Sequence, residues 1–322
     1  RFRGSIGKKS LQILGQIVRQ PGIIPALLSK GRKTSSAELF YAFRYLKKIR
    51  ELAPDCVHIH YGSVAKMLYE GGLSQRSFIT WHGFDANVLS VVQGEDMYRG
   101  LFKWHATHTV GSSFMRERLT QLGCEPERIC KIPMGVDLGQ CPPVQRGLVP
   151  EGQMFRIVST GRLIEFKGHE YLIRAVAQLR CQHSLHLRII GEGPLRKDLE
   201  RLIAKLGVEE QVELCGALPH EKVWESLQEA DLFCLTGIYA SNGQVETQGM
   251  AIIEAQAACL PVVVCDAGGA SESMVDGQTG ALCQPKNLEQ ITAAIKRYIE
   301  QPQVRRDHGR AGRAFVEKKF SI

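Results

Sequence analysis

The stretch Arg156-Ile-Val-Ser-Thr-Gly-Arg162-Leu-Ile-Glu-Phe-Lys167-Gly168 shows how this chain folds. A β-branched run is followed by a glycine turn and a basic loop, and a helical pattern occupies residues 168–181. The same succession recurs downstream. It predicts strands at Leu185–Ile190, Val212–Cys215, Asp231–Leu235 and Pro261–Cys265, and helices at residues 195–206, 221–229 and 249–259. Such alternation predicts the α/β class, a doubly wound parallel sheet with helices on both faces.

The first half of the chain alternates in the same way, with strand patterns at Cys56–His60, Ser77–Trp81 and His108–Val110. A chain of 322 residues exceeds one ordinary hydrophobic core. The segment Cys141-Pro-Pro-Val-Gln-Arg-Gly-Leu-Val-Pro-Glu-Gly152 is rich in proline and glycine, as is typical of a linker. We therefore expect a ligand cleft between two Rossmann-like domains, an N-terminal one at residues 1–141 and a C-terminal one at 154–322, joined by a linker at 142–153.

Composition places the chain among globular proteins, with 44% hydrophobic and 23% charged residues. Its ten cysteines form no C-x-x-C pair, so we expect free thiols in a reducing compartment and no zinc cluster. No apolar run approaches the roughly 18 residues of a membrane span. We expect a cytoplasmic protein, soluble or peripheral at the inner face of the plasma membrane. The chain begins with arginine and ends inside a helical pattern, so we also expect a fragment whose N-terminal domain is incomplete.

Positive charge is concentrated at the N-terminal end. The net charge is +8, whereas residues 1–50 hold twelve Lys or Arg and one acid, which is 12 − 1 = +11. The remainder carries 29 − 32 = −3, which disfavours a nucleic-acid-binding protein and favours a local anionic partner. Leu11, Leu14 and Val18 recur at helical spacing beside basic residues, as in a helix that lies on an anionic membrane. The alternative is a solvated helix packed on its own domain.

Two cations follow the strand at residues 156–160. Arg162 and Lys167 lie in the loop at its carboxyl end, where they would suit a diphosphate whose charge grows as it leaves. The alternative is a basic surface loop. The turn Gly191-Glu-Gly193-Pro194 follows the next strand, and its glycines would let a flat ligand approach closely. The alternative there is an ordinary Gly-Pro turn.

Two glutamates lie in Gly243-Gln-Val-Glu246-Thr-Gln-Gly249-Met-Ala-Ile-Ile-Glu254. The apolar residues from Met250 onward predict a short helix that begins near Gly249, and a helix N-terminus is a natural seat for phosphate. Glu246 precedes this seat, and Glu254 lies about one turn inside the helix. Because an ionised carboxylate accepts hydrogen bonds from hydroxyls, one acid would hold a transferred sugar and the other a ribose. The alternative is one acid at a helix start and one on the surface.

The spacing of these glutamates resembles the E-x7-E signature of retaining glycosyltransferases of the GT-B fold, glycosyltransferase family 4. Further motifs follow in family order and cover about residues 154–300: Thr160-Gly-Arg-Leu163 with Lys167-Gly168, Gly191-Glu-Gly-Pro194, Ala230-Asp-Leu-Phe233, Leu260-Pro-Val-Val263, Gly268-Gly269 with Glu272, and Asp276-Gly-Gln-Thr-Gly280. Two segments extend the resemblance into the first half, Thr80-Trp-His82-Gly-Phe-Asp85 and Met134-Gly-Val-Asp137. The chain looks most like exopolysaccharide transferases of the colanic acid and amylovoran type.

This resemblance implies a nucleotide-sugar donor and a saccharide or lipid-linked saccharide acceptor, bound in a cleft between two Rossmann-like domains. It implies that Arg162 and Lys167 bind the donor diphosphate. Gly249 and Met250 would donate backbone N–H groups to phosphate.

The resemblance also implies the contacts to sugar and nucleoside. Glu246 would bind hydroxyls of the transferred sugar, and Glu254 with Gly193 would bind the nucleoside through its ribose. His82 matches the histidine that contacts the donor sugar near the reacting carbon. The alternative for His82 is a strand-end histidine held by the backbone.

The sequence departs from the family pattern at three places. Thr247 stands where the family often has glycine, and Leu235-Thr236 replaces a Pro-Ser pair. The family's first strand, with its Gly-rich acceptor loop, is not seen before residue 56. No D-x-D motif is present, so we expect no metal cofactor and leave stabilisation of the departing diphosphate to the cations and the helix dipole.

The predicted activity is hexosyl transfer with retention, in exopolysaccharide or cell-surface glycan synthesis. Two alternatives stay open: an inactive nucleotide-sugar-binding subunit, and a sugar-nucleotide epimerase of the same two-domain build. A Rossmann dehydrogenase is disfavoured, because no G-x-G-x-x-G opens a helix after a strand.

Overall fold

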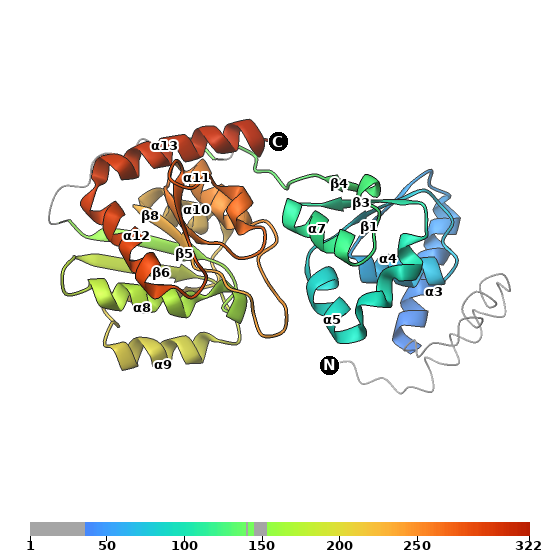
Figure 1. The fold of residues 1–322 in the computed structure, drawn as a ribbon, viewed down its shortest axis with the longest axis horizontal. Coiled ribbons are helices and arrows are strands. Elements are labelled where there is room, and N and C mark those ends of the chain that lie inside the picture. The colour runs from blue at the N-terminus through green and yellow to red at the C-terminus, as the bar shows by residue number, and fades with distance from the viewer. Residues whose placement is uncertain (1–35, 140, 145–152) are drawn as a thin grey trace. The chain divides into compact units, whose positions relative to one another are not determined.

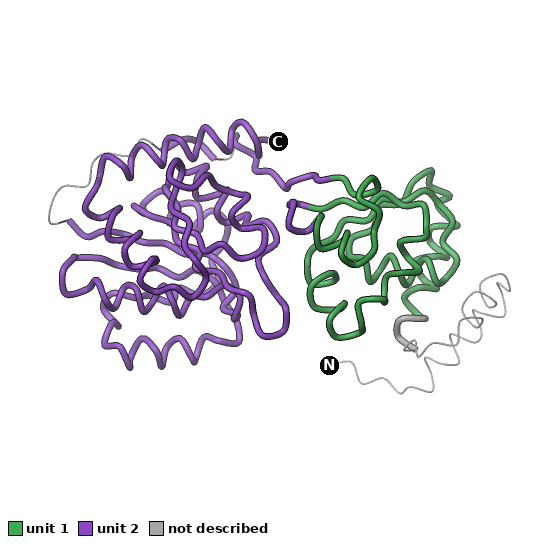
Figure 2. Tube along the Cα trace, viewed as in Figure 1, with its two compact units in different colours: residues 1–110, 116–130 green, residues 111–115, 131–322 purple. Residues whose placement is uncertain are grey.

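Two parallel β-sheets organise the chain in its computed structural model, which describes residues 36–139, 141–144 and 153–322 (Figure 1). The chain divides into two compact units, unit 1 with residues 1–110 and 116–130, and unit 2 with residues 111–115 and 131–322 (Figure 2).

The chain passes between the units after Val110, Met115 and Cys130. The last of these passages precedes the predicted linker at 142–153, of which residues 145–152 lie outside the described residues. The basic amphipathic stretch predicted around Leu11 to Val18 also lies outside them.

Unit 1 is built on four strands in the order β1-β2-β3-β4. They are β1 Val57–His60, β2 Ser77–Thr80, β3 Ala106–Val110 and β4 Ile129–Lys131. The connecting helices are α3 Ser36–Leu52, α4 Gly62–Glu70, η1 Phe84–Leu89, α5 Ser90–Gln93, η2 Glu95–Tyr98, α6 Arg99–Phe102, α7 Ser113–Gln121 and η3 Pro126–Arg128. The core of unit 1 includes Trp81, whose ring meets Tyr98 edge-on with centroids 4.8 Å apart. Such an edge-to-face contact stabilises the pair beyond its buried area.

Unit 2 is built on six parallel strands in the order β10-β9-β8-β5-β6-β7. They are β5 Phe155–Thr160, β6 Leu185–Ile190, β7 Val212–Gly216, β8 Leu232–Leu235, β9 Val262–Cys265 and β10 Gly280–Cys283. The helical elements are η4 Glu165–Lys167, α8 His169–Leu179, α9 Arg196–Leu206, α10 His220–Glu229, α11 Met250–Ala257, η5 Ala270–Ser273, α12 Leu288–Glu300 and α13 Pro302–Lys319.

Helices cover both faces of the unit 2 sheet (Figure 1). One core cluster joins the sheet to α8, α9 and α12, and a second joins its other face to α10 and α11. Every residue of β8 and β9 is therefore buried, which explains why both strands are continuous apolar runs.

The predicted strands are confirmed, each with its ends shifted by no more than two residues, and the parallel α/β architecture is confirmed in both units. The predicted helices correspond to α8, α9, α10 and α11. The strands β4 and β10 were not predicted. The strand β4 has three residues, and β10, Gly280-Ala-Leu-Cys283, starts with glycine and contains no β-branched residue, so neither has the composition typical of a strand.

Candidate active site

The strand order of unit 2 reverses between β5 and β8, because β6 and β7 lie on one side of β5 while β8, β9 and β10 lie on the other. Ligands of open parallel sheets bind at the carboxyl ends of the strands beside such a reversal. The loop after β5 carries Arg162 and Lys167, and the loop after β8 carries Glu246. Three of the predicted site residues therefore lie on the two loops that flank the reversal.

Lys167 and Glu246 form an ion pair at this point, with Lys167 Nζ 2.6 Å from Glu246 Oε2. Both side chains are only 14% exposed. Burial alone would raise the pKa of Glu246, but the Lys167 ammonium and the backbone N–H groups of Thr247 and Gly249 outweigh it, so the pKa lies below its usual value. Glu246 is therefore ionised at neutral pH and held by a cation.

Helix α11 begins directly after this pair. Gly249 precedes the helix in the left-handed conformation, with a φ of 85°, and its carbonyl accepts the N–H of Ile252 at 2.9 Å. The N–H groups of Met250 and Ala251, before Ile252, lie too early in the helix to bond to a carbonyl within it. Glu254 lies in the second turn, where burial raises its pKa more than the charges of His220 and Lys167 lower it. The two glutamates thus differ, since Glu246 is stabilised as a carboxylate and Glu254 is not.

Hydrogen bonds with neighbouring loops hold the loop that bears Glu246. The carboxylate of Glu165 accepts hydrogen bonds from the backbone N–H of Ser241 at 3.0 Å and from its hydroxyl at 2.9 Å. The hydroxyl of Tyr239 accepts the N–H of Gly268 at 3.0 Å, and the N–H of Gly269 donates to the carbonyl of Glu246 at 2.9 Å. The loop after β8 is therefore fixed to the loops after β5 and β9.

The turn after β6 packs backbone to backbone against the loop after β5. A Cβ atom at Gly191 would lie 1.9 Å from the carbonyl oxygen of Gly161, and one at Gly193 would lie 2.4 Å from that of Leu163. These glycines therefore have a packing role that the sequence did not predict. Arg162, in the same loop, has an exposed side chain.

His82 lies in unit 1, directly after β2. Its Nε2 is 2.9 Å from Nδ1 of His60, and its backbone N–H donates to Oδ1 of Asp85 at 3.2 Å. Burial lowers the pKa of His82, with Asp85 opposing and the neighbouring histidines adding to the decrease. Asp85 is fully buried and also accepts the N–H of Gly62 at 2.7 Å. The contact with Asp85 involves only the backbone of His82, and the partner of its ring is the His60 side chain and not a backbone group.

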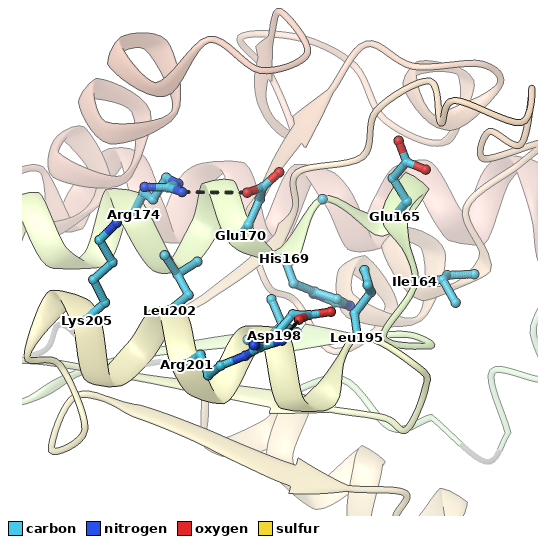
Figure 3. Close-up of a pocket in the computed structure, with 12 residues that line it drawn as sticks. Ile164, Glu165, His169, Glu170, Arg174, Leu195, Asp198, Arg201, Leu202 and Lys205 are labelled. Atoms are coloured by element: carbon cyan, nitrogen blue, oxygen red, sulfur yellow. Dashed lines mark hydrogen bonds and ion pairs between the residues drawn. The ribbon is translucent and has the colours of Figure 1, made fainter.

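A cavity of about 480 Å³ lies between α8 and α9 (Figure 3). Leu195, Leu199 and Leu202 form its apolar part. Four of its charged lining residues form two ion pairs, Arg174 with Glu170 at 3.8 Å and Arg201 with Asp198. Arg162, Lys167, Glu246 and Glu254 do not line it. This cavity is therefore separate from the Lys167–Glu246 pair.

Several residues near the pair were not predicted as site residues. Gln248, two positions after Glu246, has a buried side chain. The charge of His220, at the start of α10, lowers the pKa of Glu254 against the effect of burial. Glu272 was noted only as part of a motif. A glutamine inside a polar loop has no periodic or charge signal, so the sequence could not reveal that Gln248 is buried.

The described helices include none that is long and apolar enough to cross a membrane. The described residues likewise include no group of three His, Cys, Asp or Glu side chains arranged to hold a metal ion.

Comparison with known proteins identifies the family. Residues 146–315 match the family "Glycosyl transferases group 1", and residues 8–140 match "Glycosyltransferase Family 4". The chain belongs to the group 1 glycosyltransferases. This family assignment confirms the resemblance read from the E-x7-E spacing and its neighbouring motifs.

Curated relatives agree with this assignment. A protein of Salmonella typhimurium assigned as a colanic acid biosynthesis glycosyltransferase is 32% identical over 73% of this chain and 59% of its own length. The amylovoran biosynthesis glycosyltransferase of Erwinia amylovora is 29% identical over 85% of this chain and 64% of its own length. This glycosyltransferase chain therefore spans about three fifths of the length of these relatives.

Solved structures share the fold. Sucrose-phosphate synthase from Thermosynechococcus elongatus superposes with a TM-score of 0.74 at 20% identity, over 87% of this chain and 73% of its own. HepE of Anabaena, solved in complex with UDP, gives 0.74 at 20% identity, over 87% of this chain and 78% of its own. The GT-B fold of this glycosyltransferase chain is thereby confirmed.

Proposed function

We propose that this chain transfers a hexosyl group from a nucleotide-sugar donor to a saccharide acceptor, with retention of anomeric configuration and without a metal ion. The Lys167–Glu246 ion pair beside the start of α11 carries the proposal. A carboxylate that holds a sugar would repel the neighbouring diphosphate, and Lys167 removes that conflict by neutralising Glu246. The same ammonium would also attract a diphosphate bound by the N–H groups at the start of α11.

The proposed roles follow from charge and position. Arg162, Lys167 and the N-terminus of α11 at Met250 stabilise the negative charge that grows on the departing diphosphate, whereas the backbone N–H of Gly249 bonds to the Glu246 carboxylate. Glu246 accepts hydrogen bonds from hydroxyls of the transferred sugar while the bond to the diphosphate breaks through an oxocarbenium-like state.

We propose that other residues bind the nucleoside and contact the sugar at its reacting carbon. Glu254 accepts from the ribose, and Gly193 lines the nucleoside site. His82, neutral at pH 7 because its pKa is lowered by burial, contacts the donor sugar near the reacting carbon.

The relatives suggest a biosynthetic pathway and a class of donor. Those of Salmonella and Erwinia act in colanic acid and amylovoran biosynthesis, so we propose an exopolysaccharide or cell-surface glycan product and a lipid-linked saccharide acceptor. HepE was solved with UDP, and a mannosyltransferase of Mycolicibacterium smegmatis depends on GDP-mannose, so a nucleoside diphosphate leaving group fits the family.

We further propose that the chain binds the inner face of the plasma membrane through residues 1–50. The described part of this region is α3, where Tyr41 and Tyr45 are each 53% exposed. Exposed cations alternate with them at Arg44, Lys47 and Lys48. Aromatic and cationic side chains together favour a membrane interface.

A panel of nucleotide sugars tests the activity, scored for release of nucleoside diphosphate, for acceptor glycosylation and for the anomeric configuration of the product by NMR. We expect release with one donor class, undiminished by EDTA. Glu246→Gln should lower turnover about 100-fold, and Glu254→Gln should weaken donor binding about tenfold. Wild-type transfer by both variants would overturn the site assignment. Donor binding without release would favour the binding-subunit alternative, and isomerised donor would favour the epimerase.

A further inference from the structure

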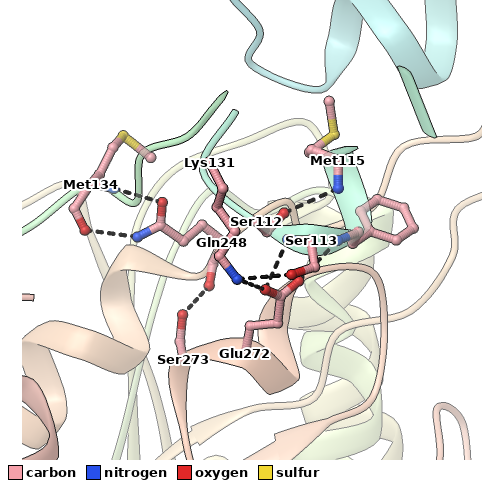
Figure 4. A network of polar contacts seen from close by, with 9 residues as sticks. Ser112, Ser113, Met115, Lys131, Met134, Gln248, Glu272 and Ser273 are labelled. Carbon is pink, nitrogen blue, oxygen red and sulfur yellow. Dashed lines mark hydrogen bonds and ion pairs between the residues drawn. The ribbon is translucent and has the colours of Figure 1, made fainter. Parts of the chain in front are cut away.

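A polar network joins Glu272 to the start of helix α7 (Figure 4). The carboxylate of Glu272 accepts the backbone N–H of Ser113 at 2.8 Å and that of Phe114 at 2.9 Å. Lys131 Nζ lies 2.8 Å from the same carboxylate and donates to the hydroxyl of Ser113 at 2.8 Å. The first N–H groups of a helix have no partner within it, so Glu272 caps α7 from a distant part of the chain.

Both oxygens of the Glu272 carboxylate accept hydrogen bonds from these donors. Burial would raise its pKa, but the Lys131 ammonium and the N–H groups of Ser113 and Phe114 outweigh burial and lower it. Glu272 is therefore ionised at neutral pH, and its negative charge lies at the positive end of the α7 dipole. A carboxylate so occupied is suited to holding structure and not to accepting a proton or a sugar hydroxyl.

The element that carries Glu272 is bonded to the loop that carries Glu246. The hydroxyl of Ser273 donates to the carbonyl of Gln248, and the N–H of Gly269 donates to the carbonyl of Glu246 at 2.9 Å. A Cβ atom at Gly269 would lie 2.1 Å from the carbonyl oxygen of Thr247, so the two segments are in direct contact. Movement of η5 therefore moves the loop.

Gln248 makes a second attachment. Its Oε1 accepts the N–H of Met134 at 2.9 Å and its Nε2 donates to the carbonyl of Met134 at 2.8 Å (Figure 4). The amide thus pairs with the backbone as a neighbouring strand would, and only 2% of Gln248 is exposed. A buried amide that loses its hydrogen-bonding partners destabilises the folded state, so separation of Gln248 from Met134 would cost free energy.

Both attachments end at passages of the chain between its units. Residues 111–115 lie between the passages after Val110 and Met115, and Lys131 follows the passage after Cys130. Glu272 bonds to residues 113 and 114 of the first segment and to Lys131, and Gln248 bonds to the backbone of Met134, three residues after Lys131. The Glu246 loop is therefore attached to residues 111–115 and 131–134, which adjoin the passages of the chain between the units.

We propose that Glu272 and Gln248 are positioning residues for the transfer reaction, which fix the Glu246 loop to the segments that join the two units. This inference rests on the proposed function. Neither side chain touches the donor, and both act through the placement of Glu246. Because a misplacement of about 1 Å costs about 100-fold in rate, small shifts of this loop lower turnover without loss of nucleotide binding.

The test compares Glu272→Gln with wild type. The amide keeps the shape of the side chain but loses the charge and one acceptor for the α7 N–H groups. We expect kcat to fall about 10- to 100-fold, while KM for the donor and Kd for the nucleoside diphosphate change less than about twofold. Gln248→Leu should act in the same direction. Lys131→Met, which leaves the cap in place, should have a smaller effect. Glu225→Gln is the matched control, because Glu225 is 51% exposed and pairs with Lys222 on its own helix, α10.

Hydrogen exchange gives a readout that does not need activity. In Glu272→Gln the amides of residues 246–250 and of Gly269 should exchange about tenfold faster, with other unit 2 amides unchanged. Unchanged kcat and unchanged exchange in the folded variant would overturn the proposal. A kcat that falls only with the folded fraction, measured by thermal melts, would also overturn it. If the wild type transfers no sugar, faster loop exchange would keep the positioning role while the proposed function falls.

Discussion

Glu246 is the residue on which charge and burial act most directly. Its carboxylate is largely removed from water, yet its pKa is lowered because Lys167 and two backbone N–H groups stabilise the ionised form. The sequence predicted both residues as ligands of the donor but did not predict that they bind each other. Opposite charges on loops after different strands carry no signal of their pairing, which depends on the strand order.

We predict that Glu246→Gln destabilises the protein by about 2 kcal/mol at pH 7, because it leaves Lys167 a desolvated ammonium without a counter-charge. Since the folded pKa of Glu246 is depressed, this contribution is complete above the usual value of 4.5 and disappears as pH falls through the lower folded pKa. Urea unfolding of both proteins between pH 7 and pH 3 measures the difference. Glu213→Gln, which removes a half-exposed partner of Arg188, should change stability by less than about 0.5 kcal/mol. A gap that persists unchanged at pH 3 would contradict the assignment.

A second residue-scale prediction concerns His82. Its pKa is lowered by burial and by the charges of His60 and His58, while Asp85 opposes. His60→Gln keeps a hydrogen-bonding partner but removes a charge, so the pKa of His82 should rise toward 6.5. In the wild type the folded pKa lies below the unfolded one, so stability should decline as pH falls from 6.5 through the folded value. An NMR titration of the His82 ring protons measures this, and an unshifted pKa in the variant would refute the coupling.

At the scale of elements, two left-handed glycines isolate the effect of close packing. Gly168, before α8, and Gly207, after α9, have nearly equal φ angles of 63° and 61°. A Cβ atom at Gly168 would lie 1.9 Å from the carbonyl oxygen of Thr236, whereas one at Gly207 would meet nothing within 4 Å. Gly207→Ala should therefore cost about 1 kcal/mol and Gly168→Ala about 3 kcal/mol. Thermal melts of both variants measure the gap, and equal costs would exclude close packing between the loops after β5 and β8.

The elements also show how far sequence reasoning reached. All described strands except β4 and β10, together with the start of α11, were predicted, because β-branched runs, glycine turns and helical patterns are local signals. The role of Glu272 was not, since capping α7 depends on contacts between residues distant in sequence. The same holds for Gln248, which looks like an ordinary loop residue until its amide is seen on the backbone of Met134.

At the scale of the whole molecule, the charge asymmetry predicts where the chain binds. Residues 1–50 carry a net charge of +11 against −3 for the remainder. We predict binding to vesicles that contain anionic lipid, weakened at least tenfold between 50 and 500 mM salt because charge attraction is screened.

Vesicle sedimentation measures this binding, with neutral vesicles as the lipid control. Replacing Tyr41 and Tyr45 together by Ser should weaken it further, because both rings are about half exposed on α3. Replacement of Tyr239, an exposed tyrosine of unit 2, is the matched protein control. Equal binding to neutral vesicles would argue against the basic segment as the anchor.

The strand order of unit 2 also dictates when its site is completed during synthesis. The ribosome delivers β5, β6 and β7 before β8, yet β5 lies between β6 and β8 in the finished sheet. One edge of β5 therefore waits unpaired until Leu232–Leu235 has emerged, and Glu246 and α11 emerge later still. Nascent chains arrested before β8 should be cut readily by protease near β5 and should not bind nucleoside diphosphate, whereas chains arrested beyond β9 should resist cleavage. We therefore expect newly made protein to pass through a stage in which β5, β6 and β7 have emerged but the Lys167–Glu246 pair cannot yet form.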